Sequence, residues 1–461
     1  MSHEETWVRL LNEGRFRVHS EPRSPVDGRN EFEDDYTRIV FSSAVRRLQD
    51  KAQVFPLDNS DFVRTRLTHS IETSAIGRSI GSSVEEEMSK RYPFFCRFRG
   101  RLSAILATVG FAHDLGNPPF GHFGEKAIRS FFVSYFSGNT HGLTEAQRAD
   151  LERFEGNAQT FRLLTRLQYL IGEEGFNLTF GTLASQMKYP CSSLEVKDGT
   201  DVRCRKNGYF QSEKDRFERV RDETGIGHMR HPLAFLLEAA DDIAYSAADI
   251  EDGLKKNVID IGIIRETIRD QADRAEADPS EVLAKLDKYL GDCHKDYPDK
   301  DEIAVQRFRI YVQGQMIASV VKEFLARHDS MLDGTFTSEI LAVSEAGWIR
   351  EAFKTLAVKV FHDRQIMTRE LAGERVIEGL LREFTAAVDS DRPIKKGSKE
   401  EKLYLLVSPN YRFMCETYPS ARQSGCPSLY DRLLLVTDFV CGMTDSYALS
   451  LYRKLTGMTL E

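Results

Sequence analysis

The sequence has few cysteines and no long apolar run, and these absences exclude several classes of protein. Its 461 residues contain seven cysteines, an odd number, spread from Cys96 to Cys441 without a CxxC pair. This pattern fits neither a disulfide framework nor a zinc ribbon, and it predicts reduced thiols in a cytoplasmic protein. No stretch approaches the roughly 20 apolar residues of a membrane-spanning helix, and the polar, acidic start has no signal-peptide core. We therefore expect no membrane association.

The chain also has no excess of basic residues and no strand-like pattern. It carries 63 Lys and Arg against 71 Asp and Glu, a formal net charge of -8, so it lacks a global electrostatic signature for nucleic acid. We find no Gly-rich phosphate loop, no internal repeat and no convincing period-two run. Hydrophobic residues make up 41% of the chain, enough for a sizeable core. Amphipathic helical patterns dominate, and they predict an all-α fold.

The length and the pattern suggest how the chain is divided. At roughly 150 residues per domain, it could hold about three units or one large helical body. We expect an irregular N-terminal segment over residues 1–35, a core over 36–260 that holds the candidate site described below, and a C-terminal helical region over 261–461 packed on it. Residues 191–224, rich in charge and glycine, predict a surface insertion or lid. The helices expected after the core cover residues 259–275, 279–289, 302–328, 338–358, 364–389, 403–418 and 428–455.

The segment 111–125 is the part of the chain most typical of a functional site. His113 and Asp114 are adjacent and follow an apolar helical run, so they can present one nitrogen and one oxygen ligand to the same metal ion. Glycines and prolines then force a turn. His122 and Glu125 come next, three residues apart and therefore on one face of a new helix. This arrangement of polar residues indicates a functional site rather than residues that only pack in the core.

A second polar group precedes the helix that follows residue 70. Arg66 lies three residues before His69, so a cation and an imidazole share one helix face. This places a partner for phosphate beside a candidate metal ligand. A basic helix face at Arg46 and Arg47 is equally compatible with phosphate contact and with simple exposure to solvent.

A third group lies on an apolar helix expected over residues 232–253. Because so apolar a helix should be buried, its carboxylates need partners or a metal ion. Asp241 shares a stripe with Tyr245 and Asp249, but periodicity alone leaves Asp241 and Asp242 as alternatives. Together with the earlier histidines, the set offers two imidazoles and two carboxylates. Such ligands suit Mn²⁺, Fe²⁺, Co²⁺ or Mg²⁺ with open water positions better than a structural zinc.

In these segments the chain resembles the HD-domain phosphohydrolases, and within them the bacterial dGTPase-like group of dNTP triphosphohydrolases. The resemblance spans nearly the whole chain and is strongest over residues 36–255. It implies an all-α HD core, a homo-oligomer (often a hexamer) and hydrolysis of a dNTP, with dGTP favoured, to the deoxynucleoside and inorganic tripolyphosphate. The matching motifs are Arg47-Leu-Gln-Asp-Lys-Ala-Gln-Val-Phe55, Arg66-Leu-Thr-His69-Ser, His113-Asp-Leu-Gly-Asn-Pro-Pro-Phe-Gly-His122-Phe-Gly-Glu125, Phe154-Glu-Gly-Asn-Ala-Gln159, Lys188-Tyr-Pro190, Glu238-Ala-Ala-Asp-Asp-Ile-Ala-Tyr245 and Asp438-Phe-Val-Cys-Gly-Met-Thr-Asp445.

The resemblance also assigns roles to individual residues. It implies a divalent metal ion held by His69, His113, Asp114 and Asp241, which chooses Asp241 over its neighbour. His122 would be the catalytic histidine, with Glu125 holding its ring. The residues that would contact the triphosphate, sugar or base are Gln53, Arg66, Asn117, Lys188, Tyr245 and Asp249.

Three other interpretations stay open on the sequence. The chain could be an HD enzyme for another nucleotide, a monophosphatase or a phosphodiesterase. It could be a di-metal oxygenase on a similar helical core, although the other histidines stand in less suitable contexts. It could also be a sensor that binds a nucleotide or single-stranded DNA without turnover. A dNTP or single-stranded DNA effector, seen in some of the family, is a further expectation.

Overall fold

The chain folds into helices throughout the part that the structure describes. This computed structural model describes residues 2–18, 26–57, 63–197, 199, 201–294, 296–361, 364–389, 394–420 and 427–458, without the side chains of 246–249, 361, 364 and 365. Within these ranges extended pairing is limited to two isolated bridges, so the all-α prediction is confirmed. The α-helices are α1 (His3–Leu10), α2 (Glu31–Val40), α3 (Ser43–Arg47), α4 (Arg66–Arg91), α5 (Arg101–Ala112), α6 (Gly121–Tyr135), α7 (Glu145–Glu152), α8 (Gly156–Arg162), α9 (Phe180–Gln186), α10 (Lys214–Thr224), α11 (Pro232–Lys255), α12 (Ile261–Arg274), α13 (Ser280–Asp292), α14 (Lys300–Leu332), α15 (Ile340–Val343), α16 (Gly347–Phe361), α17 (Arg364–Val388), α18 (Lys399–Leu406), α19 (Pro409–Thr417), α20 (Leu429–Cys441) and α21 (Asp445–Leu455).

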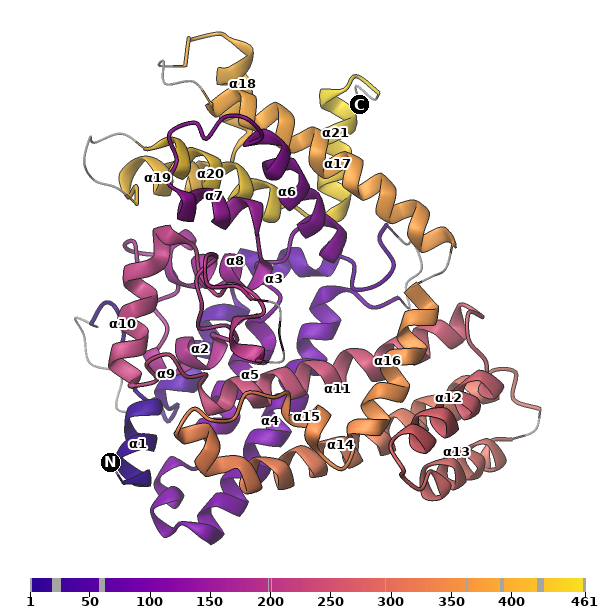
Figure 1. The fold of residues 1–461 in the computed structure, drawn as a ribbon. Helices are drawn as coiled ribbons and strands as arrows, with labels where there is room; N and C mark the ends of the chain where they lie inside the picture. Colours follow the sequence, from indigo (N-terminus) through magenta and orange to yellow (C-terminus); the bar gives the residue numbers. More distant parts are fainter. Residues whose placement is uncertain are drawn as a thin grey trace.

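Helices α4, α5 and α11 form the centre of the molecule (Figure 1). Small residues let α4 and α5 cross closely. A Cβ on Gly77 would lie 2.8 Å from the Leu106 carbonyl oxygen, and one on Gly81 would lie 2.6 Å from the Ser103 Cα. Such contacts leave no room for a side chain. The crossing brings the first turn of α4 close to the end of α5, where the adjacent histidine and aspartate stand.

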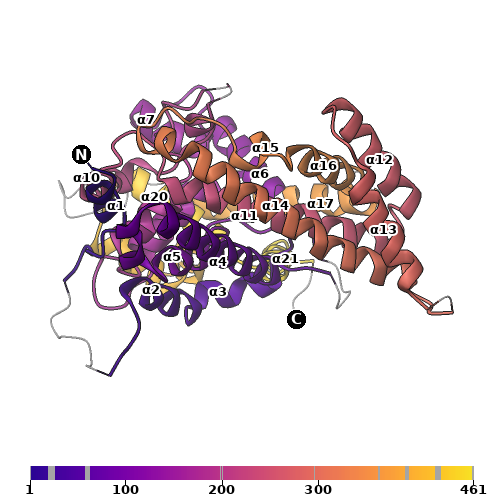
Figure 2. The same cartoon turned by 90° about the horizontal axis from the view of Figure 1, so that it is seen from below.

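The long helices after the centre form two further groups. Helices α14 and α16 pack against α11, and α12 and α13 extend beyond them at one end of the molecule (Figure 2). Helices α17 to α21 lie with α6 and α7 at the opposite side of the centre (Figure 1). The predicted helix 428–455 is in fact two, because the Thr444 side chain caps a new helix at the backbone N–H of Tyr447. The division into a core and a C-terminal region stays a prediction.

The N-terminal segment differs from the prediction. Residues 1–35 were expected to be irregular, but α1 begins at His3 and α2 at Glu31. Ser2 and Glu5 form a reciprocal capping box at the start of α1. Trp7 is fully buried, so the helix is held by packing as well as by its cap.

The segment 191–224 also differs from the prediction of a surface insertion or lid. It contains α10, and Phe210, Phe217 and Val220 are fully buried, so much of it belongs to the core. The prediction that all cysteines are reduced is wrong for Cys191 and Cys204, which form a disulfide. The chain reverses between them and brings their Cα atoms to 5.4 Å, within the usual disulfide range.

The remaining described cysteines are free thiols, and they are Cys96, Cys293, Cys415 and Cys441. Cys426 lies outside the described residues. Among the helices that the structure describes, none combines the length and the apolar character needed to cross a membrane.

Candidate active site

The predicted site residues gather around a cavity of about 720 Å³ bordered by the starts of α4 and α6, the end of α5 and the middle of α11. Eleven of the twelve line it. Those eleven are Gln53, Arg66, His69, His113, Asp114, Asn117, His122, Glu125, Lys188, Asp241 and Tyr245. The side chain of Asp249 lies outside the described residues. The cavity therefore unites residues that lie far apart in the sequence.

The four candidate metal ligands come together in the wall of this cavity. The Asp241 Oδ1 atom lies 3.1 Å from His69 Nε2 and 3.2 Å from His113 Nε2. The Asp114 Oδ1 atom lies 3.5 Å from His113 Nε2. His69, His113 and Asp114 offer ligand atoms within 4.8 Å of one another. His69, His113 and Asp114 are buried, and Asp241 is partly exposed toward the cavity.

The hydrogen bonds of His113 suit a bound cation. Its Nδ1 lies 2.7 Å from the Gly110 carbonyl oxygen, so Nδ1 carries the proton and donates. The Nε2 lone pair then faces the carboxylates of Asp114 and Asp241, and this buried atom has no hydrogen-bond donor among the described residues. Acceptors that face one another repel unless a proton or a metal ion lies between them. Burial lowers the pKa of His113, but the two carboxylates more than offset it and raise that pKa, so this position favours positive charge.

Two buried cations hold the carboxylates in their ionised form. Arg66 Nη1 lies 2.5 Å from Asp114 Oδ2, and Lys188 Nζ lies 2.9 Å from Asp241 Oδ2. Burial opposes ionisation of both acids, yet these cations and the neighbouring histidines hold the pKa of each carboxyl well below its usual range. In each acid one oxygen faces the imidazoles and the other is held by a cation. Arg66 and Lys188 thus orient the candidate ligands, a role that the sequence did not predict.

The two adjacent aspartates have different surroundings in the structure. Asp241 points into the cavity, whereas Asp242 forms an ion pair with Arg350. Burial raises the pKa of Asp242 to about 6, against the attraction of Arg350. Only Asp241 is therefore within reach of the histidines. Periodicity could not make this distinction, because it depends on which neighbouring helix each side chain meets.

His122 and Glu125 lie on the first turn of α6, at the edge of the cavity. The His122 ring is 82% exposed, and its Nδ1 lies 3.4 Å from Glu125 Oε2. Glu125 is buried and its Oε1 accepts a hydrogen bond of 2.8 Å from the Gly156 backbone N–H. Burial works against its charge, but the hydrogen bond from His122 and the charge of Lys206 lower the pKa of Glu125 to about 2. An ionised carboxylate thus stands behind an accessible imidazole.

The other expected contact residues have distinct positions. Asn117 donates from Nδ2 to Asp114 Oδ1 at 2.6 Å, so it orients a candidate ligand. Gln53 lines the cavity with a buried Oε1 atom that lacks a donor among the described residues. Tyr245 lines the cavity one helical turn after Asp241.

Several cavity residues were not found from the sequence. Lys206 lies in a segment without a matching motif, and its Nζ is 3.0 Å from Glu155 Oε1. Glu155 belongs to a polar run to which the sequence gives no individual role. Met367 and Glu370 come from α17, more than 100 residues after α11. No local pattern links such distant residues to the cavity.

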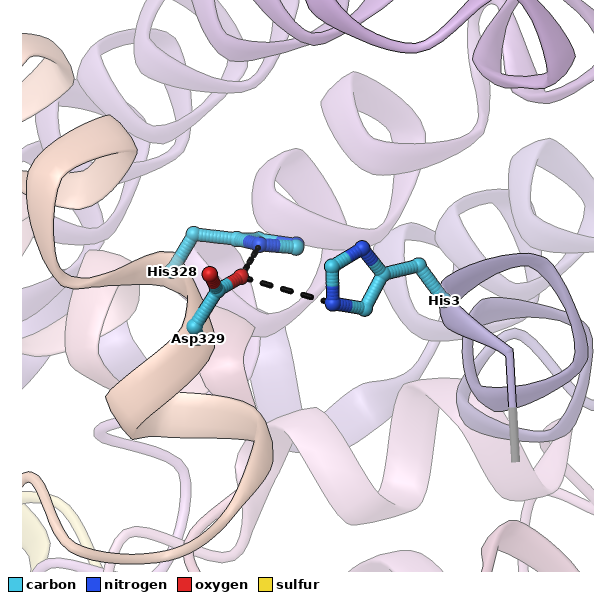
Figure 3. Close-up of side chains that lie close together, drawn as sticks. All are labelled: His3, His328 and Asp329. Atoms are coloured by element: carbon cyan, nitrogen blue, oxygen red, sulfur yellow. Dashed lines mark hydrogen bonds and ion pairs between the residues drawn. The ribbon is translucent and has the colours of Figure 1, made fainter.

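A second histidine and aspartate cluster joins α1 to α14 (Figure 3). His3 Nε2 and His328 Nδ1 both face Asp329 Oδ1, at 3.4 and 2.8 Å. The Trp7 indole N–H donates to His328 Nε2 at 3.0 Å, so both nitrogens of His328 are already engaged. Burial lowers the pKa of His328, which favours a neutral ring that donates from Nδ1. The cluster therefore holds α1 and α14 together. His328 has no free nitrogen lone pair with which to bind a metal ion.

Comparisons with known proteins find relatives that match this chain over most of its length. No protein-family model matches the chain. A deoxyguanosinetriphosphate triphosphohydrolase-like protein of Listeria monocytogenes is 40% identical over 98% of this chain and 100% of its own length. One of Synechocystis sp. is 34% identical over 98% of this chain and 100% of its own length. A deoxyguanosinetriphosphate triphosphohydrolase of Yersinia enterocolitica is 30% identical over 92% of this chain and 93% of its own length.

Proposed function

The chain belongs to the deoxyguanosinetriphosphate triphosphohydrolase-like family of hydrolases, and from this premise we propose that it hydrolyses dNTPs, dGTP first among them, to the deoxynucleoside and inorganic tripolyphosphate. One observation carries the proposal. Asp241 Oδ1 lies 3.1 and 3.2 Å from the Nε2 atoms of His69 and His113, and Asp114 Oδ1 lies 3.5 Å from His113 Nε2. This group stands beside an accessible imidazole, His122, that contacts a buried carboxylate. The cavity around them, about 720 Å³, has the volume of a small-molecule site.

A divalent cation fits the donor set. His69 and His113 would offer their Nε2 atoms, and Asp114 and Asp241 would offer the oxygens not held by Arg66 or Lys188. When bound, such an ion polarises a phosphate oxygen and lowers the pKa of a water molecule. Mn²⁺, Mg²⁺, Fe²⁺ and Co²⁺ all suit a mixed nitrogen and oxygen set.

The side chains of the chain itself bind the triphosphate and move the proton. Three cations, Lys206, Arg66 and Lys188, line the cavity and would attract phosphate oxygens. Such anchoring holds the α-phosphorus in line for attack. His122, oriented by Glu125 through Nδ1, would carry a second proton on Nε2 as the imidazolium and transfer it to the leaving 5′-oxygen. Tyr245 would pack on the deoxyribose, leaving little room for a 2′-hydroxyl.

Product analysis separates this proposal from its alternatives. The four dNTPs are supplied singly and in pairs, with Mn²⁺ or Mg²⁺, and tripolyphosphate is separated from orthophosphate. We expect tripolyphosphate and the deoxynucleoside, and faster turnover in a pair would reveal an effector. Orthophosphate or a nucleoside monophosphate would instead support another HD phosphohydrolase. Nucleotide binding without any product would support a sensor.

Other expectations from the sequence remain part of the proposal. They are a homo-oligomer, with a hexamer among the expected sizes, a dNTP or single-stranded DNA effector, a cytoplasmic location, and a core over residues 36–260 followed by a C-terminal helical region. Light scattering with and without dNTPs tests the assembly. The salt dependence of single-stranded DNA binding tests that effector.

A further inference from the structure

The turn that leads into α6 holds a bulky residue in an unusual backbone conformation. Phe120, the residue before α6, has φ 61° and ψ 18°, which lies in the left-handed region. This region is disfavoured for residues with a Cβ, and especially for bulky ones. Phe120 stands two residues before His122, so its backbone angles set the direction in which the first turn of α6 presents the imidazole. Something outside the turn must stabilise this conformation.

Asp445, the first residue of α21, supplies that stabilisation. Its Oδ1 accepts a hydrogen bond of 3.0 Å from the Phe120 backbone N–H. Its Oδ2 accepts one of 3.0 Å from the Ala52 backbone N–H, directly before the cavity residue Gln53. Asp445 is 2% exposed, so water does not compete for either bond. One side chain from the last helix thus ties together two backbone segments at the cavity.

Two further contacts hold the same turn from the C-terminal helices. Lys51 Nζ donates to the carbonyl oxygens of Asn117 and Cys441, at 2.6 Å each, and so joins the turn to the end of α20. The Phe120 ring lies against Gly373 of α17, where an added Cβ would be 2.6 Å from the ring. The turn is therefore enclosed by α17, α20 and α21, and Asp445 is the contact that acts on the Phe120 backbone itself.

We propose that Asp445 is a positioning residue for His122, acting through the backbone of Phe120. Without its carboxylate, Phe120 is free to leave the left-handed region, and the first turn of α6 then moves relative to the four candidate metal ligands. A misplacement of about 1 Å at a reacting group can cost on the order of 100-fold in rate. The kinetic test of this role rests on the proposed function. The stabilisation of the Phe120 backbone by Asp445 can be tested without measuring turnover.

The kinetic test compares Asp445→Ala and Asp445→Asn with Ser446→Ala as a matched control. Ser446 is the exposed neighbour, and its hydroxyl donates a hydrogen bond to Asp50 rather than to the backbone of Phe120. For Asp445→Ala we expect kcat to fall by about 10- to 100-fold, with KM and bound metal nearly unchanged. The kcat of Asp445→Asn should lie between those of the wild type and Asp445→Ala. An amide oxygen can accept from one backbone N–H, but the amide then turns its own N–H groups toward the other. Ser446→Ala should match the wild type, and a KM effect that equals the kcat effect would overturn the proposal.

A double-mutant cycle separates positioning from a general loss of folded enzyme. If Asp445 acts through His122, Asp445→Ala should change the residual rate of His122→Ala by less than about twofold. If Asp445→Ala only reduced the fraction of folded enzyme, the rate of the double variant would fall by the product of the two single losses. Fully multiplicative effects would therefore overturn the inference.

Hydrogen exchange gives a readout that needs no activity. In Asp445→Ala, we expect faster exchange at the amides of Phe120 and Ala52, with unchanged exchange in α4, α5 and α11. Unchanged protection at Phe120 would overturn the inference whatever the kinetics. If the wild-type enzyme releases no tripolyphosphate from any dNTP, the proposed function is overturned. The exchange experiment would still show whether Asp445 stabilises the Phe120 backbone.

Discussion

Replacing Glu125 with glutamine should impair proton transfer without removing the metal ion. Glu125 Oε2 faces His122 Nδ1 at 3.4 Å, and a carboxylate can only accept there, so it keeps the proton on Nδ1 and leaves Nε2 for the cavity. A glutamine side chain at this position has nearly the same shape and can still accept from the Gly156 N–H. Its amide, however, carries no charge and can present an N–H to the ring. The wrong tautomer of His122 then becomes available, and the imidazolium loses its counter-ion.

The size of the effect follows from the distance and the exposure of the ring. At 3.4 Å, with an effective dielectric constant between about 40 and 80 for a largely exposed imidazole, the attraction is about 1.2 to 2.4 kcal/mol. This corresponds to about 8- to 60-fold in rate. A buried triad loses about 10⁴-fold when the corresponding carboxylate becomes an amide. Because His122 is 82% exposed, we expect the smaller loss, about 8- to 60-fold in kcat.

The assay measures kcat, KM and bound metal for Glu125→Gln beside the wild type. We expect a lower kcat, nearly unchanged KM and full metal content. Stability gives an independent check. The pKa of Glu125 is lowered from 4.5 to about 2, so its ionisation stabilises the fold above about pH 4.5, and this contribution is lost as the pH falls toward 2. The variant should lack this part of acid sensitivity. A kcat within about twofold of wild type would refute the assignment of Glu125 as the residue that holds the ring.

Three further predictions test other parts of the site. Asp241→Asn should lower metal affinity by more than about 100-fold in a metal-binding titration, whereas the matched Asp242→Asn should retain the metal because Asp242 pairs with Arg350. Tyr245→Ala should narrow the ratio of dGTP to GTP hydrolysis, and equal rates with both nucleotides in the wild type would remove the proposed sugar discrimination. Gly116→Ala should destabilise the fold by several kcal/mol in denaturant unfolding, because its Cβ would lie 2.2 Å from the Thr160 backbone nitrogen and overpacking against backbone cannot relax.

Much of the site could be predicted because it is encoded locally. His113 and Asp114 directly follow α5, and His122 and Glu125 share the first turn of α6, so their grouping needs only helix periodicity and a turn. The start of α1 is encoded in the same local way, since the capping box of Ser2 and Glu5 is visible in the sequence. The prediction that residues 1–35 are irregular was therefore wrong, although the sequence contains this signal for a helix.

The remaining features depend on packing between distant segments. Asp445 meets Phe120 across 325 residues, and Cys191 meets Cys204 only because the chain reverses between them. Lys206 reaches the cavity from a segment whose burial could not be read from its charged composition. Such contacts follow from how helices cross, and a single sequence carries no periodic signal for them.

The burial of the two candidate metal ligands Asp114 and Asp241 links the stability of the fold to the proposed chemistry. Removing Asp114 and Asp241 from water would favour their neutral forms, which bind cations poorly. Arg66, at the start of α4, and Lys188, just after α9, prevent this by holding one oxygen of each acid. Both cations also line the cavity, where a triphosphate would be drawn to them. The same pair of charges therefore keeps both carboxylates ionised in the folded protein and, under the proposed function, would also attract the triphosphate.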